Sequence, residues 1–284
     1  AQIYSLKRKI NPKFFIVDHR LRPESTKEAE AVQKILRRVS INLEILIWKG
    51  KKPKNNIQSI ARKARYQLMN NRCEKYKIKN LLVGHHQDDL IENFFIRMVR
   101  GSGLKGLVSM DKKSKIEKMN IYRPLIDQKK DDLILVSKKV FDFYIKDPSN
   151  NDEKFQRTRI RKLIKELKKD GFDMNKFLKT IKNLKYSNNI INFYVAENLK
   201  QNTFYSNKDK RLILSKSFFL KSYEVVFRGL SDSLKKIGGK YYSVRGKKLE
   251  KMIYDIQNNR LFKSTLGGCI VEKVNQTIII SKEG

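Results

Sequence analysis

Histidines and carboxylates are concentrated in one stretch of the sequence, His85–Glu92. Asp88 and Asp89 stand side by side, and Glu92 follows Asp89 by three residues, on the same face of a helix. Adjacent carboxylates can position an amine or hold Mg²⁺ beside phosphates, and His85 and His86 can contact a nucleotide or move protons. The alternative is a helix start that Asp88 caps and Glu92 completes as a capping box. Two of the three histidines are adjacent here, which favours a functional site.

Two basic segments have residues suited to phosphates. Arg62 and Arg65 are one turn apart on a predicted helix, and Arg157 opens another helix. Guanidinium groups and the backbone donors of a helix start both attract anions. A solvated basic face is the alternative in both cases. Gly101-Ser102-Gly103 allows close backbone approach to phosphate, although a plain helix stop is the simpler explanation.

The first half of the chain has the pattern of an α/β fold. Short apolar runs predict strands at Phe14–Val17, Leu43–Ile47 and Leu81–Val83, and helical patterns cover Thr26–Val39, Ile57–Tyr76 and Asp88–Arg100. Alternating strands and helices predict a doubly wound, mainly parallel sheet. Ligands bind beyond the carboxyl ends of such strands. Asp18 and His19 follow one strand and His85 follows another, so we expect them to meet at that edge.

The second half is predicted to be less regular. We expect a charged loop at Asp111–Lys118 and an extended piece at Ile121–Ile126. Five helices are expected at Lys129–Phe143, Phe155–Lys169, Met174–Gln201, Phe218–Ile237 and Lys247–Asn258. Two strands, Thr265–Val271 and Thr277–Ser281, should flank a hairpin turn at Asn275-Gln276. Asp147–Phe155 reads as a polar link. These features predict a catalytic domain over residues 1–150, a helical connector over 151–204 and a small α+β domain over 205–284.

The composition favours a polyanionic partner. The 284 residues include 64 Lys and Arg against 29 Asp and Glu, a formal charge of +35. Neutralising phosphates releases counterions, so a polyanion is the first physical explanation, with codon bias towards Lys as the alternative. The two cysteines, Cys73 and Cys269, lack metal-ligand spacing. No apolar run is long enough to span a membrane. Both observations favour a cytoplasmic protein that acts without a membrane.

Five blocks, taken in order, resemble the motifs of bacterial tRNA(Ile)-lysidine synthetases, a family of N-type ATP pyrophosphatases. The blocks are Val17–Ser25 ("hDHxLRxxS"), Ala61–Tyr66 ("ARxxRY"), His85–Leu107 ("HHxDDQxET…RGSGxxGL"), Arg123–Leu125 ("RPL") and Asp147–Arg161 ("DxSNxDxxFxRNxIR"). Leu90, Asn93 and Thr158 depart mildly from these patterns. The family's "SGGxDS" pyrophosphate loop is absent, and it is expected one helix before Val17. Because Ala1–Lys9 resembles the end of that helix, we expect an N-terminally truncated fragment with little activity of its own. A degenerate gene is the second option.

The resemblance implies a specific reaction. ATP would adenylate the C2 oxygen of the wobble cytidine in tRNA(Ile) with anticodon CAU, releasing pyrophosphate. Free L-lysine would then displace AMP to give lysidine, which changes decoding from AUG to AUA. The residue roles implied are catalysis for Asp89, Glu92 and Arg157, nucleotide binding for Asp18, His19, Arg65, His85 and His86, and Mg²⁺ binding for Asp88. Asp89 and Glu92 would hold the lysine amine, and Arg65 and Arg157 would stabilise phosphate charge. The basic C-terminal domain would hold the tRNA. A homodimer is one option for the assembly.

Two other functions stay open at this point. One is another tRNA-modifying enzyme of the same fold, such as a thiolase, although Cys73 and Cys269 lie at neither place where such enzymes carry cysteines. The other is a catalytically dead protein that still binds tRNA. It would retain tRNA without turnover.

Overall fold

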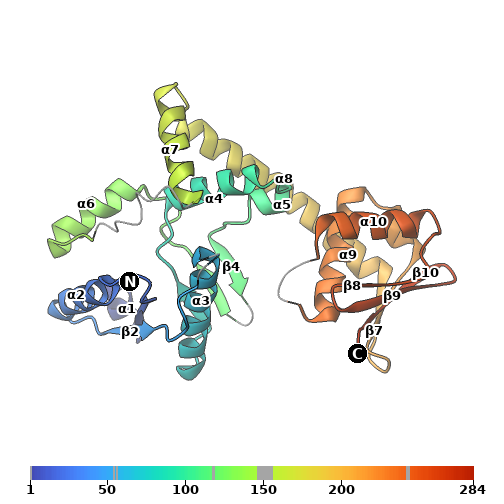
Figure 1. Ribbon diagram of the computed structural model, residues 1–284, viewed down its shortest axis with the longest axis horizontal. Helices are drawn as coiled ribbons and strands as arrows, with labels where there is room; N and C mark the ends of the chain where they lie inside the picture. The colour runs from blue at the N-terminus through green and yellow to red at the C-terminus, as the bar shows by residue number, and fades with distance from the viewer. Residues whose placement is uncertain (1, 54, 56, 117–118, 146–155, 241–243) are drawn as a thin grey trace. The chain divides into compact units, whose positions relative to one another are not determined.

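The computed structural model describes residues 2–53, 55, 57–116, 119–145, 156–240 and 244–284. The chain separates into two compact units, Ala1–Asp173 and Met174–Gly284 (Figure 1). The division into domains at residues 150 and 204 stays a prediction. The polar link expected at Asp147–Phe155 lies outside the described residues.

The first unit is a mixed α/β structure whose strands pair mainly in parallel. Its elements are α1 (Gln2–Lys7), β1 (Phe14–Asp18), α2 (Ser25–Arg38), β2 (Leu43–Ile47), α3 (Ile57–Lys75), β3 (Asn80–Leu82), α4 (Gln87–Val99), α5 (Leu104–Leu107), β4 (Lys113–Ile116), β5 (Met119–Tyr122), α6 (Lys130–Phe141) and α7 (Gln156–Lys169). β1 pairs with β2 in parallel, and β3 pairs with β5 in parallel. These pairs confirm the predicted α/β class, with the strands divided between two sheets.

One face of α3 joins the two sheets of the first unit. Tyr66, Met69 and Cys73 follow helical spacing, so they project from the same side of the helix. They form a buried cluster with Leu46 on β2 and with residues of the other sheet, namely Leu81, Met119 and Ile121. This cluster fixes the position of the strand ends at which the polar residues gather.

The charged loop predicted at Asp111–Lys118 is wrong for residues 113–116, which form β4. β4 pairs antiparallel with β5, Lys113 opposite Tyr122. A strand at the edge of a sheet is stabilised by backbone pairing and tolerates exposed lysines, so its composition resembles that of a loop. The extended piece predicted at Ile121–Ile126 is correct only as far as Tyr122. Beyond it the chain turns, and the amide of Ile126 donates to the carbonyl of Arg123.

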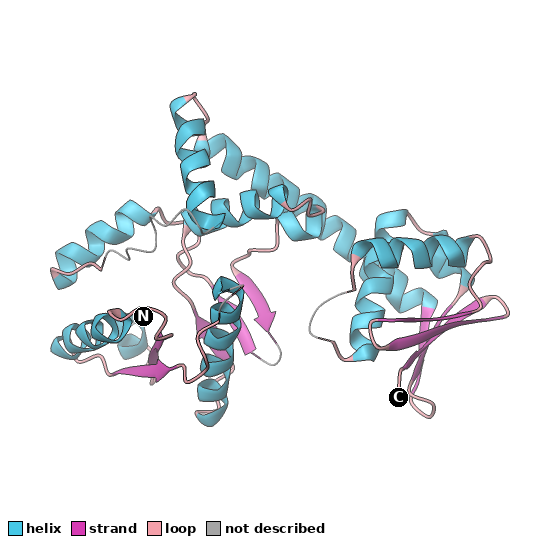
Figure 2. Cartoon of the chain, viewed as in Figure 1, coloured by secondary structure: helices cyan, strands magenta, loops and turns pink. Residues whose placement is uncertain are grey.

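The second unit combines helices with an antiparallel sheet (Figure 2). Its elements are α8 (Met174–Asn202), β6 (Thr203–Ser206), β7 (Arg211–Leu214), the 3-10 helix η2 (Lys216–Leu220), α9 (Tyr223–Gly238), α10 (Gly246–Gln257), β8 (Lys263–Leu266), β9 (Cys269–Val274) and β10 (Thr277–Lys282). The sheet order is β6-β7-β10-β9-β8. The predicted hairpin at Asn275-Gln276 is confirmed, because Thr277 pairs with Val274.

Three expectations for the second unit need correction. The strand predicted at Thr265–Val271 is two strands, since Gly267 and Gly268 have φ angles of +67° and +78° and turn the chain between β8 and β9. The helix predicted from Phe218 begins at Tyr223, because η2 precedes it. β6 and β7 were not predicted, since their short runs are separated by charged turn residues.

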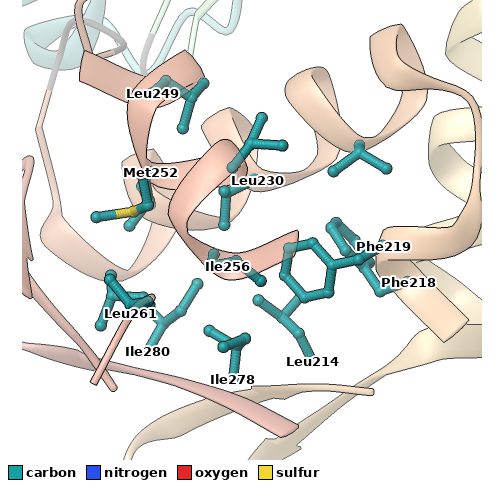
Figure 3. Close-up of a cluster of buried hydrophobic side chains, with 14 of the residues drawn as sticks. Leu214, Phe218, Phe219, Leu230, Leu249, Met252, Ile256, Leu261, Ile278 and Ile280 are labelled. Atoms are coloured by element: carbon teal, nitrogen blue, oxygen red, sulfur yellow. The ribbon is translucent and has the colours of Figure 1, made fainter. Parts of the chain in front are cut away.

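The core of the second unit lies between its helices and one face of its sheet (Figure 3). Leu230 on α9 and Leu249 on α10 are fully buried against Leu214 and Ile280 on the sheet. Among the described residues, no helix is both long and apolar enough to cross a membrane.

Candidate active site

Asp18 holds the turn that follows β1. It is buried, and its carboxylate accepts hydrogen bonds from the Arg20 amide (2.9 Å), Ser25 Oγ (2.7 Å) and Thr26 Oγ1 (2.7 Å). Burial alone raises the pKa of Asp18, but the hydrogen bonds from Thr26, the Arg20 amide and Ser25 outweigh it and keep the pKa below its usual value. The geometry favours a role in shaping the loop over the nucleotide contact expected from the sequence.

His19 and Arg65 meet at the same strand ends. Arg65 Nε on α3 donates to His19 Nε2 at 3.2 Å. Trp48 lies just after β2, and its ring packs edge to face with the His19 imidazole, with the ring centroids 6.4 Å apart. The Trp48 amide donates to the Asp18 carbonyl at 2.9 Å and so extends the β1–β2 pairing to these residues. Burial, and then the charge of Arg65, lowers the pKa of His19 to about 4, with Asp18 acting in the opposite direction.

The start of α4 carries the histidine and carboxylate cluster. The amide of His86 donates to Asp89 Oδ2 at 3.0 Å, and His86 Nε2 lies 3.4 Å from the same oxygen. Asp89 is therefore the carboxylate that caps this helix, in place of Asp88 and Glu92, which the capping interpretation had named. In the described part of the chain, Asp89 Oδ1 has no hydrogen-bond partner. Burial lowers the pKa of His85 to about 4 and outweighs the negative charge of Asp89, which acts to raise the pKa.

Glu92 is buried and already paired. Arg161 on α7 places Nε 2.5 Å from Glu92 Oε1 and Nη2 3.3 Å from Oε2. The Glu92 side chain is 5% exposed and the Arg161 side chain 32%. Glu92 was expected to hold a lysine amine, but its two oxygens are taken by this pair, so the geometry favours a positioning role. Arg161 was not among the predicted site residues. Its signals in the sequence are its place one turn after Arg157 and its match to the last position of the block Asp147–Arg161.

Positive charge gathers around the open side of Asp89. Arg157 and Asp89 are close enough for their charges to act on the guanidinium of Arg65. Arg62 and Arg157 likewise act on His85. In the described residues neither Arg157 nor the Nη nitrogens of Arg65 have a hydrogen-bond partner. The structure thus brings Asp89, His85, Arg65 and Arg157, which come from three helices and a strand end, close enough for their charges to interact.

The glycine segment after α4 is a helix stop. Gly101 has a φ angle of +67°, and its amide donates to the carbonyl of Met98 at 2.9 Å. The amide of Ser102 donates to the carbonyl of Arg97 at 3.0 Å. Since these amides close the helix, they are not available to a phosphate, and the simpler of the two interpretations fits.

A metal ion would find few protein ligands here. Asp88 lies on the first turn of α4, and its charge acts on Arg161. Over the described residues, no group of three or more His, Cys, Asp or Glu side chains is arranged to hold a metal ion. Mg²⁺ often binds through one carboxylate together with substrate phosphates, and only that mode fits Asp88.

A mixed α/β domain that carries histidines, a carboxylate and arginines to its strand ends defines a nucleotide-handling class of protein. Residues 1–167 match the family described as the PP-loop domain. The chain belongs to this family.

Relatives with a curated description resemble the chain over most of its length. It is 38% identical over 279 residues to the tRNA(Ile)-lysidine synthase of Orientia tsutsugamushi (strain Boryong), covering 94% of the chain and 62% of that protein. It is 34% identical to the enzyme of the same description in Wolbachia pipientis wMel, with the same coverage. For Rickettsia bellii (strain OSU 85-389) the identity is 32%, over 100% of the chain and 65% of the relative. The chain therefore spans slightly less than two thirds of these relatives.

Among solved structures, the U34-tRNA thiolase NcsA from Methanococcus maripaludis, with its [4Fe-4S] cluster, has a TM-score of 0.48 and 20% identity to the chain. The match covers 60% of this chain and 62% of that one. A likeness of this size carries no functional information.

Proposed function

We propose that this protein belongs to an ATP-dependent ligase that joins lysine to the wobble cytidine of tRNA(Ile) with anticodon CAU. The observation that carries the proposal is that Asp89, Arg65 and Arg157 lie close enough for their charges to interact, and that among the described residues neither Asp89 Oδ1, nor Arg157, nor the Nη nitrogens of Arg65 have a hydrogen-bond partner. Such a site can hold a cation and a phosphate side by side. Membership of the PP-loop domain family supports the use of ATP.

The arginines suit the adenylation step. The C2 oxygen of the cytidine attacks the α-phosphorus of ATP, one oxygen–phosphorus bond forms, and the bond to pyrophosphate breaks. Negative charge grows on the phosphate oxygens in the transition state. Arg65 and Arg157 would stabilise it, and in support of this role neither forms an ion pair with a carboxylate among the described residues. His85 stays neutral near pH 7, since burial keeps its pKa at about 4, and can line the nucleotide site without adding charge.

The carboxylate suits the second step. The lysine ammonium group first loses a proton, because only the neutral amine has a lone pair. The amine attacks C2, a carbon–nitrogen bond forms, and AMP leaves with the C2 oxygen while the nitrogen loses a second proton. A lysine ammonium group needs a carboxylate that is not already paired, and Asp89 Oδ1 meets that condition. Glu92 supports this step indirectly. Its pair with Arg161 ties α4 to α7, and α7 also carries Arg157.

The remaining roles concern the substrates. A tRNA would be held mainly through its phosphates by the basic surface, for which the charge of +35 provides the attraction. Mg²⁺ would arrive with ATP and take Asp88 as its protein ligand. The reaction would take place in the cytoplasm, where tRNA and free lysine are found.

Labelled lysine tests the proposal. The protein expressed from its complete gene is incubated with ATP, labelled L-lysine and unmodified tRNA(Ile) with anticodon CAU. A matched tRNA differing only in an altered wobble base is the control. We expect label in the first tRNA alone and only with ATP present. Label in neither tRNA, with tRNA still bound, would favour the catalytically dead alternative.

The thiolase alternative would need a reactive cysteine. Cys73 and Cys269 are both buried, and burial raises the pKa of each thiol. Buried thiols with a raised pKa are poor nucleophiles. Neither cysteine therefore suits sulfur transfer.

A further inference from the structure

The arginines near the site differ in the partners that their guanidinium groups contact. Arg161 is neutralised by the carboxylate of Glu92. Arg123 is buried, and its Nη1 donates to the Asp111 carbonyl and to Ser114 Oγ. Arg65, by contrast, is exposed, and a neutral imidazole is its hydrogen-bond partner. That difference calls for a physical explanation.

The direction of the hydrogen bond fixes the state of His19. The guanidinium of Arg65 can only donate, so Nε2 of His19 must carry a lone pair. A charged imidazole has no lone pair on either nitrogen, so His19 is neutral and its proton lies on Nδ1. Nδ1 is shielded from solvent and has no hydrogen-bond partner within the described chain. Among the described residues, the one hydrogen bond of the ring is therefore that with Arg65.

A neutral acceptor has a specific advantage for an anion site. A carboxylate on Arg65 Nε would orient the guanidinium equally well but would cancel its charge. The imidazole orients Arg65 through Nε and leaves both Nη nitrogens and the full charge for a phosphate. The surroundings hold the ring neutral: burial and Arg65 lower the pKa of His19 to about 4 against the opposing charge of Asp18. The Trp48 ring, in edge-to-face contact, restrains the imidazole further.

We propose that His19 is a positioning residue that aims the guanidinium of Arg65 at a phosphate of the bound nucleotide and does not itself contact the ligand. This proposal rests on the proposed use of ATP, and it replaces the direct nucleotide contact expected for His19. The phosphate would take the two Nη nitrogens of Arg65 in the bidentate manner that guanidinium groups favour.

A double-mutant cycle on ATP affinity, measured by calorimetry, tests the proposal. Without His19 the Arg65 side chain is free to move, and ATP binding must order it at a cost of about 0.5–1.5 kcal/mol. His19→Ala should therefore raise the Kd for ATP roughly three- to tenfold. Arg65→Ala should raise it more, and adding His19→Ala to Arg65→Ala should change nothing further. Additive losses would overturn the proposal, because they would mean that His19 contacts the ligand independently. Arg72→Ala, which removes another cation from the same helix, should leave the Kd unchanged.

Two substitutions at His19 separate orientation from charge. His19→Gln keeps a neutral acceptor near the position of Nε2 and should preserve most of the affinity. His19→Glu keeps the acceptor but neutralises Arg65, so it should bind ATP at least as weakly as His19→Ala. Equal affinities for the Gln and Glu variants would contradict the proposal, since a purely structural role would tolerate both.

The tautomer is measured without any nucleotide, which separates this proposal from the proposed function. The chain has three histidines, all in this site, so ¹⁵N-histidine labelling gives three imidazoles to assign. We expect His19 to carry its proton on Nδ1, and Arg65→Ala to shift it towards the Nε2–H form. A charged or Nε2–H ring in the unaltered protein would overturn the positioning role even if ATP binds. Failure to bind ATP with the expected tautomer present would instead contradict the proposed function.

Discussion

The pair between Glu92 and Arg161 predicts a large loss of stability when one partner is removed. Arg161→Met leaves a buried carboxylate, whose side chain is 5% exposed, without its cation. Breaking a fully buried pair costs about 3–5 kcal/mol, and because Arg161 is 32% exposed we expect the lower end, about 3 kcal/mol. For a unit of this size that corresponds to a fall in Tm of roughly 6–12 °C.

Urea denaturation measures this loss in the first unit alone. Trp48 is the only tryptophan in the sequence and lies in the first unit, so its fluorescence follows the unfolding of that unit. Arg72→Met is the matched control. Arg72 also pairs with a glutamate, at 2.7 Å, but Glu44 is 33% exposed, and such pairs contribute less than about 1 kcal/mol.

Removing both partners should recover stability. In the double variant with Glu92→Gln and Arg161→Met neither charge of the pair remains, so its loss of stability should be well below the sum of the single losses. A loss of under about 0.5 kcal/mol for Arg161→Met, or strict additivity in the double variant, would refute the burial argument.

Three further outcomes follow from the same geometry. Asp89→Asn should keep tRNA affinity and lose lysine incorporation, and filter binding that shows lost tRNA affinity would count against its role. Between pH 6.5 and 4 the unfolded chain binds up to two more protons than the folded one, because burial first of all lowers the pKa of both His19 and His85 to about 4. The free energy of unfolding of the first unit should therefore fall as the pH drops from 7 to 4.5, and urea midpoints that stay constant or rise would contradict this. Gly238→Ala would drive a Cβ into the carbonyl oxygen of Gly267 and should destabilise the second unit by about 1–3 kcal/mol, which circular dichroism during thermal unfolding can measure.

Apolar runs and helical spacing were sufficient to predict most of the longer helices and the parallel strands β1, β2 and β3 of the first unit. Leu43–Ile47 was predicted at its observed bounds, because four of its five residues are large and apolar, as is usual in a parallel strand. β4 was missed because its stability comes from backbone pairing with β5, which its polar side chains do not reveal. The turn at Gly267-Gly268 was likewise hidden within a run of strand-forming residues.

Strand order also underlies much of the prediction for the candidate site. The expectation that Asp18, His19 and His85 share one edge rests on the topology of a single parallel sheet and stays a prediction, since β1 and β3 belong to different sheets. The topology does not predict which side chains pair with one another. Glu92 and Arg161 are 69 residues apart, and no pattern in the sequence reveals that they pair. The hydrogen bond from Arg65 to His19 joins residues 46 positions apart, and no pattern in the sequence reveals it either.

The composition of the product tests the central claim most directly. After reaction with ATP and lysine, the anticodon nucleosides of tRNA(Ile) are analysed by mass spectrometry, and released AMP and pyrophosphate are counted. The account predicts that the wobble cytidine alone gains the mass of one lysine less one water, with one AMP and one pyrophosphate released for each lysine added. An unchanged cytidine, or modification without release of AMP, would contradict it.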